Sequence, residues 1–297
     1  MLLTFLLPTL FALAAASHAA ADTTPIDCDH CADWNRPQPA FRIFGNTYYV
    51  GVHGVSTVLI DSGHGLVLID GGLPQSAAKI AANIRALGFK ISDVRWILNS
   101  HAHFDHAGGI AALQRMSGAR VAASALGKGG LIAGRAVHDD PQAGYGDDTR
   151  FPAVGRVTAI ADGASVDVGK LSITAHATPG HTPGSTTWTW RSCERRHCVD
   201  VVYADSLSAV SSPDFRFSED AVRVRQFRSS IAKVRALPCQ IMIAAHPDGG
   251  RLFAEHDASA QRGRDAFIDA SACRTYADNA LAKFDARLAE EVAPPAK

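Results

Sequence analysis

The chain has 297 residues, and its 29 lysines and arginines balance its 29 aspartates and glutamates, so its formal net charge is zero. A hydrophobic fraction of 47% with 20% charged residues excludes an intrinsically disordered chain. The neutral balance, without any basic run, also excludes a protein that binds nucleic acid through bulk positive charge. A chain of this length can bury a large core without metals or disulfides, so any such site needs its own explanation.

The first segment of the chain is typical of a secretory signal peptide. Residues 2–16 are almost wholly apolar, and the small residues that follow offer cleavage after Ala19 or after Ala21, although no lysine or arginine precedes the apolar run. The run is shorter than the roughly 20 residues of a membrane-spanning helix, which disfavours an uncleaved anchor. We therefore predict a signal peptide over 1–21, export to the periplasm, and a single domain over 22–297 that is free of the membrane.

Alternating apolar residues, helical periodicity and turn residues predict the elements of this domain. In chain order they are a strand over 41–52 with a turn at Gly45-Asn46, a hairpin of strands over 56–60 and 65–69, a helix over 76–87, a strand over 94–98, a helix over 106–116, a strand over 120–123, a long loop over 136–152, two strands within 157–178, strands over 186–191 and 199–204, a helix over 219–237, a strand over 240–245, and a final helix over 273–292. Many strands with helices between and after them, and no linker, predict one layered α/β or α+β domain.

Cysteine usage agrees with export, because an even number of cysteines fits an oxidising compartment. The spacing of the six cysteines suggests the pairs Cys28–Cys31 and Cys193–Cys198, which leaves Cys239 with Cys273. The run Cys28-Asp29-His30-Cys31 is also compatible with a redox-active or zinc-binding CxxC motif, so the role of this pair stays open.

The residues that indicate chemistry follow the predicted strand over 94–98. They form the run His101-Ala102-His103-Phe104-Asp105-His106, which Ala107-Gly108-Gly109 follows. Residues two apart in an extended segment point the same way, so His101 and His103 can bind one metal ion. Asp105 and His106 lie at the start of the next helix and can bind a second ion. Four metal-binding side chains within six residues are not the pattern of an ordinary polar loop, and imidazoles with a carboxylate suit zinc.

This hexad resembles the motif of the metallo-β-lactamase superfamily, and the resemblance covers roughly residues 37–288. The family's other motifs are matched by Leu68-Ile69-Asp70-Gly71-Gly72, by the segment 178–184 around His181, and by the segment 244–247 around His246. The resemblance implies a four-layer αββα sandwich with the metal site at one edge, between the two sheets.

The same resemblance implies a ligand set for two zinc ions per chain. The first site consists of His101, His103 and His181, and the second of Asp105, His106 and His246. Asp70 is implied to contact a ligand histidine and orient it rather than to bind metal.

The segment Tyr203-Ala204-Asp205-Ser206-Leu207-Ser208-Ala209 resembles the third subclass of metallo-β-lactamases. In that subclass the residue at Ser206 bonds a metal-bound water, and Ser206 and Ser208 are implied to hold the substrate carboxylate. The segment 187–193 and the Cys239/Cys273 pair resemble the same subclass. A shift of one residue is the alternative, in which Asp205 bridges the two ions as in glyoxalases, lactonases and RNA-processing members.

The activity that follows from the resemblance is hydrolysis of the β-lactam amide bond by a metal-bound hydroxide, which would confer antibiotic resistance. Asp105, His181 and Ser206 are the residues expected in catalytic roles, the partners are small β-lactam molecules, and the protein is expected to be a monomer. The alternatives are a glyoxalase-like zinc hydrolase of thioesters or lactones, and an exported metal-binding protein without hydrolytic activity.

Overall fold

The computed structural model describes residues 22–293, so the predicted signal peptide over 1–21 lies outside the described residues. Twelve strands form two sheets within this part of the chain. The first sheet has seven strands in sequential order: β1 (Phe41–Phe44), β2 (Thr47–Tyr49), β3 (Val58–Asp61), β4 (Leu66–Ile69), β5 (Val94–Leu98), β6 (Arg120–Ser124) and β7 (Val157–Ile160). The second has the order β12 (Ile241–Ala244), β11 (His197–Ala204), β10 (Thr186–Glu194), β9 (Leu171–Ala177) and β8 (Ser165–Val168).

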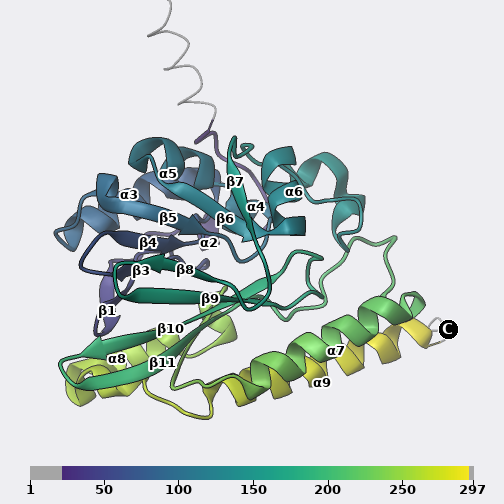
Figure 1. The fold of residues 1–297 in the computed structure, drawn as a ribbon. Coiled ribbons are helices and arrows are strands. Elements are labelled where there is room, and N and C mark those ends of the chain that lie inside the picture. Colours follow the sequence, from purple (N-terminus) through teal and green to yellow (C-terminus); the bar gives the residue numbers. More distant parts are fainter. Residues whose placement is uncertain (1–21, 294–297) are drawn as a thin grey trace, which may run out of the picture.

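Helices cover the outer face of each sheet (Figure 1). Those over the first sheet are α3 (Ala77–Ala86), α4 (Phe104–Ala107), α5 (Ile110–Ser117) and α6 (Ala125–Ala133), and those over the second are α7 (Ala221–Ala236) and α9 (Ala272–Val292). The remaining α-helices are α2 (Cys31–Trp34) and α8 (Leu252–Arg262). Short 3₁₀ helices occupy Pro74–Ser76, Ile91–Asp93, Ala143–Thr149, Phe217–Glu219, Pro247–Gly249 and Gly263–Phe267.

Three clusters of buried side chains fill the spaces between these layers. The central cluster joins the inner faces of the two sheets and includes Ile60, Ile69, Trp188 and Tyr203, which are all fully buried. A second cluster lies between the first sheet and helices α3, α5 and α6, and a third lies between the second sheet and helices α7 and α9. The predicted αββα architecture is confirmed.

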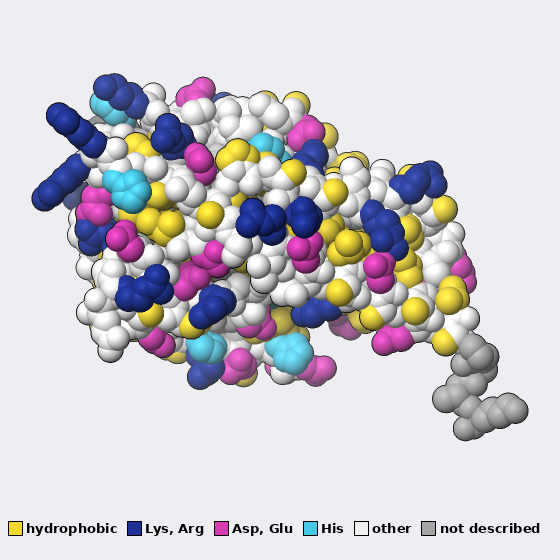
Figure 2. Space-filling view, turned by 90° about the horizontal axis from the view of Figure 1, so that it is seen from below, with side chains coloured by type: hydrophobic (Ala, Val, Ile, Leu, Met, Phe, Trp, Pro, Cys, Tyr) yellow, Lys and Arg dark blue, Asp and Glu magenta, His cyan; other side chains and the backbone are white. Residues whose placement is uncertain are grey.

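Helices α7 and α9 pack side by side and are joined on their exposed faces by ion pairs. Arg228 pairs with Asp285 at 2.5 Å, and Arg235 pairs with Asp278 at 2.7 Å. Figure 2, which views the molecule from below, shows side chains of both signs interspersed with hydrophobic ones on this face. The mixture agrees with the neutral net charge of the chain.

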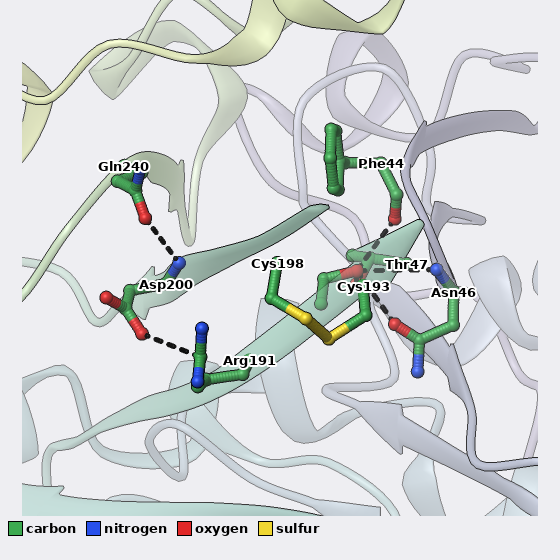
Figure 3. Close-up of a disulfide and its surroundings, with 9 residues drawn as sticks. Phe44, Asn46, Thr47, Arg191, Cys193, Cys198, Asp200 and Gln240 are labelled. Carbon is green, nitrogen blue, oxygen red and sulfur yellow. Dashed lines mark hydrogen bonds and ion pairs between the residues drawn. A yellow bond between two sulfur atoms is a disulfide. The ribbon is translucent and has the colours of Figure 1, made fainter. Parts of the chain in front are cut away.

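Three disulfides form, in the pairs Cys28–Cys31, Cys193–Cys198 and Cys239–Cys273. Cys193 and Cys198 face each other across the β10–β11 hairpin (Figure 3). Cys239 precedes β12 and Cys273 lies in the first turn of α9, so this disulfide ties α9 to the second sheet. The sulfur atoms of Cys28 and Cys31 are bonded to each other, so in this form they are not available to zinc.

Some predicted elements were wrong in detail. The segment 157–178 contains three strands rather than two, and the helix predicted over 106–116 is divided into α4 and α5 at Gly108 and Gly109. Helices α6 and α8 were not predicted, and the loop predicted over 136–152 contains the 3₁₀ helix Ala143–Thr149. Within residues 22–293, no helix has both the length and the apolar character needed to cross a membrane.

Candidate metal centre

The predicted ligands meet at the carboxyl ends of parallel strands. β4 and β5 run parallel in the first sheet, and β11 and β12 run parallel in the second. Asp70 directly follows β4, Asp205 directly follows β11, and His101 and His246 lie within three residues of the ends of β5 and β12. Because the ends of parallel strands share one edge of a sheet, the two sheets bring these segments together at one end of the central layer.

Glycines allow the hexad to pack tightly against the turn after β4. The backbone N–H of Gly71 donates to the carbonyl of His106 at 2.8 Å, and that of Gly109 donates to the carbonyl of Gly72 at 3.0 Å. A Cβ atom at Gly109 would lie 2.2 Å from the carbonyl oxygen of Gly71, which a side chain does not tolerate. Contacts between the two glycine-containing segments therefore fix the position of the helical turn that carries His106.

The first predicted site is assembled by three buried imidazoles. Potential ligand atoms of His101, His103 and His181 all lie within 4.8 Å of one another. Their ring centroids are 4.8 to 4.9 Å apart. The Nε2 atom of His101 is buried and has no hydrogen-bond partner among the described residues. A buried nitrogen without a partner is costly unless a cation occupies the space it faces, so this donor set fits a metal ion.

The second predicted site faces the first across His101. Asp105 Oδ2 lies 3.3 Å from the Nε2 atoms of both His106 and His246, and these two nitrogens are 3.2 Å apart. The ligand atoms of His101, Asp105 and His106 also lie within 4.8 Å of one another. Two imidazole nitrogens this close need a proton or a metal ion between them, so this set also fits a cation.

Each of the five histidines is held through the ring nitrogen that faces away from its site. Three are held by carboxylates: His101 Nδ1 lies 2.7 Å from Asp205, His103 Nε2 lies 3.1 Å from Asp140, and His106 Nδ1 lies 3.3 Å from Asp70. Two donate to backbone carbonyls: His181 Nδ1 to Ser208 at 2.9 Å and His246 Nδ1 to Gly54 at 2.8 Å. A partner on the far nitrogen fixes the tautomer and aims the other nitrogen at a metal.

Asp70 is fully buried and has a left-handed backbone conformation, with φ of 62°. Its carboxylate accepts hydrogen bonds from the backbone N–H and the hydroxyl of Ser100, from the amide of Asn99, and from the hydroxyl of Tyr203. Burial and the nearby Asp70 charge raise the pKa of Tyr203 well above its usual value, so its hydroxyl keeps the proton that it donates. These donors hold the Asp70 carboxylate in the position from which it contacts His106 Nδ1 and orients the ring.

The segment after β11 brings Asp205 and the two serines to different histidines. Asp205 is fully buried and contacts the Nδ1 atom of His101. The hydroxyls of Ser206 and Ser208 are 2.9 Å apart, and that of Ser208 lies 3.2 Å from His181 Nδ1. Asp205 therefore contacts the far nitrogen of His101, and Ser208, with Ser206 bonded to it, contacts the far nitrogen of His181.

Charge and burial shift the pKa values of these imidazoles in opposite directions. Burial, together with His106 and His103, lowers the pKa of His101 well below its usual value, and burial with His101 and His103 lowers that of His181 to about 3. Both are neutral at neutral pH, which is the form that binds metals. Burial acts against the proton on His106, but Asp105 and Asp70 outweigh it and raise its pKa to about 10. A metal ion would displace this proton.

Three residues around the site were not predicted from the sequence. Asp140 comes from the predicted long loop, 37 residues from His103, and is 5% exposed. Trp34 lies with its ring centroid 5.1 Å from that of His246, and Gly54 provides the carbonyl that holds the same histidine. Nothing in the sequence distinguishes Asp140, because the same loop contains a second acidic pair, Asp147-Asp148.

Residues 50–246 match the family model of the metallo-beta-lactamase superfamily. The chain belongs to this superfamily. Among solved structures, the Rm3 metallo-beta-lactamase is 50% identical, with 89% of this chain and 99% of that chain covered at a TM-score of 0.87. SMB-1 in a complex with mercaptoacetic acid is 47% identical, with 87% and 99% covered at a TM-score of 0.84. MEM-A1, a subclass B3 metallo-beta-lactamase from a soil metagenome library, is 49% identical, with 87% and 98% covered at a TM-score of 0.84.

Curated relatives in the superfamily are more distant. A hydroxyacylglutathione hydrolase of Anaeromyxobacter dehalogenans is 37% identical over 135 residues, which are 45% of this chain and 41% of the relative. One of Acidiphilium cryptum is 27% identical over 207 residues, or 68% of this chain and 64% of the relative. The chain thus spans between two fifths and two thirds of the length of these curated relatives. The predicted resemblance to the superfamily and to its third subclass is confirmed.

Proposed function

We propose that this protein is a zinc-dependent β-lactamase that binds two zinc ions and hydrolyses the amide bond of β-lactam antibiotics. The observation that carries the proposal is the arrangement after β11, where Asp205 contacts the far side of His101 and leaves the hydroxyls of Ser206 and Ser208 beside His181. Solved structures that are similar over nearly the whole chain are named as metallo-β-lactamases, which supports the same substrate class.

The residues divide into two groups that hold metal and one that holds substrate. His101, His103 and His181 would hold the first zinc ion, and Asp105, His106 and His246 the second. Zinc supplies a Lewis acid for the carbonyl oxygen and makes a water molecule acidic near neutral pH.

The hydroxyls of Ser206 and Ser208 would donate to the carboxylate that β-lactam antibiotics carry. No lysine follows Ser206 within the next several residues, so these hydroxyls and the metal bind that carboxylate without a cationic side chain. Asp70 and Asp205 act through His106 and His101, because each accepts from the far nitrogen of its histidine.

The same arrangement predicts an inhibitor. SMB-1 has been crystallised with mercaptoacetic acid, a thiol that carries a carboxylate. A thiolate suits zinc as a ligand, and the carboxylate suits the two serine hydroxyls. We expect mercaptoacetic acid to inhibit this protein competitively with a β-lactam substrate.

Export of the chain and a monomeric mature form remain part of the proposal. Three disulfides and an apolar first segment support maturation in the periplasm, where β-lactams must pass to reach their targets.

A hydrolase of glutathione thioesters is the second candidate, since curated relatives carry that name. The two are separated by measuring kcat/KM for a chromogenic cephalosporin and for lactoylglutathione, with metal analysis of the same sample. We expect two zinc ions per chain, turnover of the cephalosporin, and loss of turnover with a chelator. Preference for the thioester, or a zinc-saturated chain with one ion or none, would overturn the proposal.

A further inference from the structure

His246 is the least enclosed of the six proposed ligands. Its side chain is 26% exposed, whereas none of the other five exceeds 9%. It is also held by a neutral carbonyl, while His101, His103 and His106 each have a carboxylate behind them. Charge-assisted hydrogen bonds are about twice as strong as neutral ones, so His246 depends more on its packing than do the three histidines with carboxylate partners.

That packing comes from a segment near the start of the described chain. The ring of Trp34 lies against that of His246, with centroids 5.1 Å apart at an interplanar angle of 44°. The backbone N–H of Gly54 donates to the carbonyl of Trp34 at 3.0 Å, while the carbonyl of Gly54 accepts from His246. A Cβ atom at Gly54 would lie 2.2 Å from the indole of Trp34, so the glycine is what lets the ring pack here.

Trp34 cannot rely on a surrounding core to stay in place. It forms one wall of an open pocket of about 310 Å³, together with His53, Pro247 and Phe253. Apart from its contacts with His30, Gly54 and His246, its position depends on its own backbone, which belongs to the single turn of α2.

The Cys28–Cys31 disulfide anchors that turn. Cys31 is 2% exposed, and its backbone N–H donates to the carbonyl of Cys28 at 3.0 Å. The backbone N–H of Trp34 donates to the carbonyl of His30 at 2.8 Å. A helical turn of only four residues is unstable by itself in water, so this covalent closure stabilises α2, together with the hydrogen bonds that Gly54 and Ser76 donate to Trp34 and Asn35.

We propose that Trp34 is a positioning residue for His246 and that the Cys28–Cys31 disulfide acts through Trp34 to set the affinity of the second zinc site. The proposal rests on the proposed function, in which His246 binds the second ion. It gives the CxxC motif a role in metal binding without contact between sulfur and zinc.

The test measures the two stepwise zinc dissociation constants of the full mature chain by competition with a chromophoric chelator. Trp34→Ala should weaken the second constant about 10- to 100-fold, as is typical for residues that hold a metal ligand, and leave the first unchanged. Trp34→Phe keeps a ring against His246 and should restore most of the affinity. The absorption spectrum of the cobalt-substituted chain should change only in the contribution of the second ion.

The disulfide is tested with a matched control. The double variant Cys28→Ser/Cys31→Ser should weaken the second site in the same way as Trp34→Ala. The control is Cys193→Ser/Cys198→Ser, which removes another short-loop disulfide at the end of β11 opposite Asp205 (Figure 3) and should change neither constant.

Two outcomes would overturn the inference. One is an unchanged second constant in Trp34→Ala, and the other is an equal loss at both sites, which would mean general destabilisation. A wild-type chain that binds only one zinc ion would instead refute the proposed function, so the two failures are distinguishable.

Discussion

At the scale of single residues, the roles of Asp205 and Ser206 decide how the site binds metal and substrate. The Ser206 hydroxyl contacts that of Ser208, which lies next to His181, and the Asp205 carboxylate contacts His101. Ser206→Ala should keep two zinc ions and lower kcat/KM about 10- to 150-fold, since a hydrogen bond to a charged group contributes roughly 1.5–3 kcal/mol. Asp205→Asn should weaken zinc binding about 10- to 100-fold without abolishing it. A silent Ser206→Ala combined with complete loss of metal in Asp205→Asn would show that Asp205 bridges the ions.

Asp140 provides a second residue-scale prediction. Both of its carboxylate oxygens lie 3.1 Å from His103 Nε2, and the backbone N–H of Gln142 holds one of them at 2.8 Å. Asp140→Asn removes the charge that fixes the ring of His103, so zinc affinity at the first site should fall about 10- to 100-fold. The neighbouring Asp139 is exposed, and Asp139→Asn serves as the matched control. Equal affinities for both variants in a chelator competition would count against this role.

The difference between these residues shows what the sequence can predict about a site. His101, His103, Asp105 and His106 are recognisable because they are close together in the chain and follow a strand. Asp140 reaches its histidine only through the path of a long loop, which no local pattern specifies. The choice between Asp205 and Ser206 depends on one residue of register at a strand end, and the motif fits either until side-chain contacts are known.

At the scale of elements, the strongly periodic segments are predicted best. The helix predicted over 76–87 is α3, and that predicted over 219–237 contains α7, because both have an apolar stripe that packs on a sheet. Helix α6 was missed because glycines at 127, 129 and 130 lower helix propensity. Packing requires glycines here, because a Cβ atom at Gly130 would collide with Ala102 and a Cβ atom at Gly184 would collide with Gly127. The glycines therefore let α6 approach both the hexad and the loop that carries His181.

Helix α8 carries a carboxyl group that makes stability depend on pH. Burial, with a contribution from Asp269 and against Arg251, raises the pKa of Glu255 to about 7 from an ordinary value of 4.5. Between these values the folded chain binds more protons than the unfolded chain, so this group lowers stability as pH rises from 4.5 to 7. Glu255→Gln cannot ionise, so its unfolding temperature relative to the wild type should be higher at pH 8 than at pH 5. Thermal unfolding at both pH values measures the difference.

The control for this prediction is Glu290→Gln, which changes an exposed carboxyl near the end of α9. Its unfolding temperature relative to the wild type should change little between the two pH values. A Glu255→Gln variant that behaves like this control would contradict the assignment of the raised pKa.

At the scale of the whole molecule, export of the protein can be tested by measuring the mass of the mature chain. The apolar segment over 2–16 predicts removal of the signal, with a mature N-terminus between Ala20 and Asp22. The three disulfides predict a mature chain without free thiols. Intact-mass measurement of the exported protein, with and without thiol alkylation, should give the truncated chain and no alkylation before reduction. Retention of residue 1 with six alkylated cysteines would refute export.

The division of the molecule into two sheets has a consequence for its heat resistance. Each disulfide joins residues within one half of the chain, as the pairs Cys28–Cys31, Cys193–Cys198 and Cys239–Cys273 show. The proposed zinc ligands come from both halves, and His106 and His246 are 140 residues apart. Zinc would therefore be the cross-link that joins the halves, and an ion at about 100 times its dissociation constant stabilises the folded state by about 2.7 kcal/mol. Chelation should remove this cross-link between the halves and lower the unfolding temperature while every disulfide stays intact.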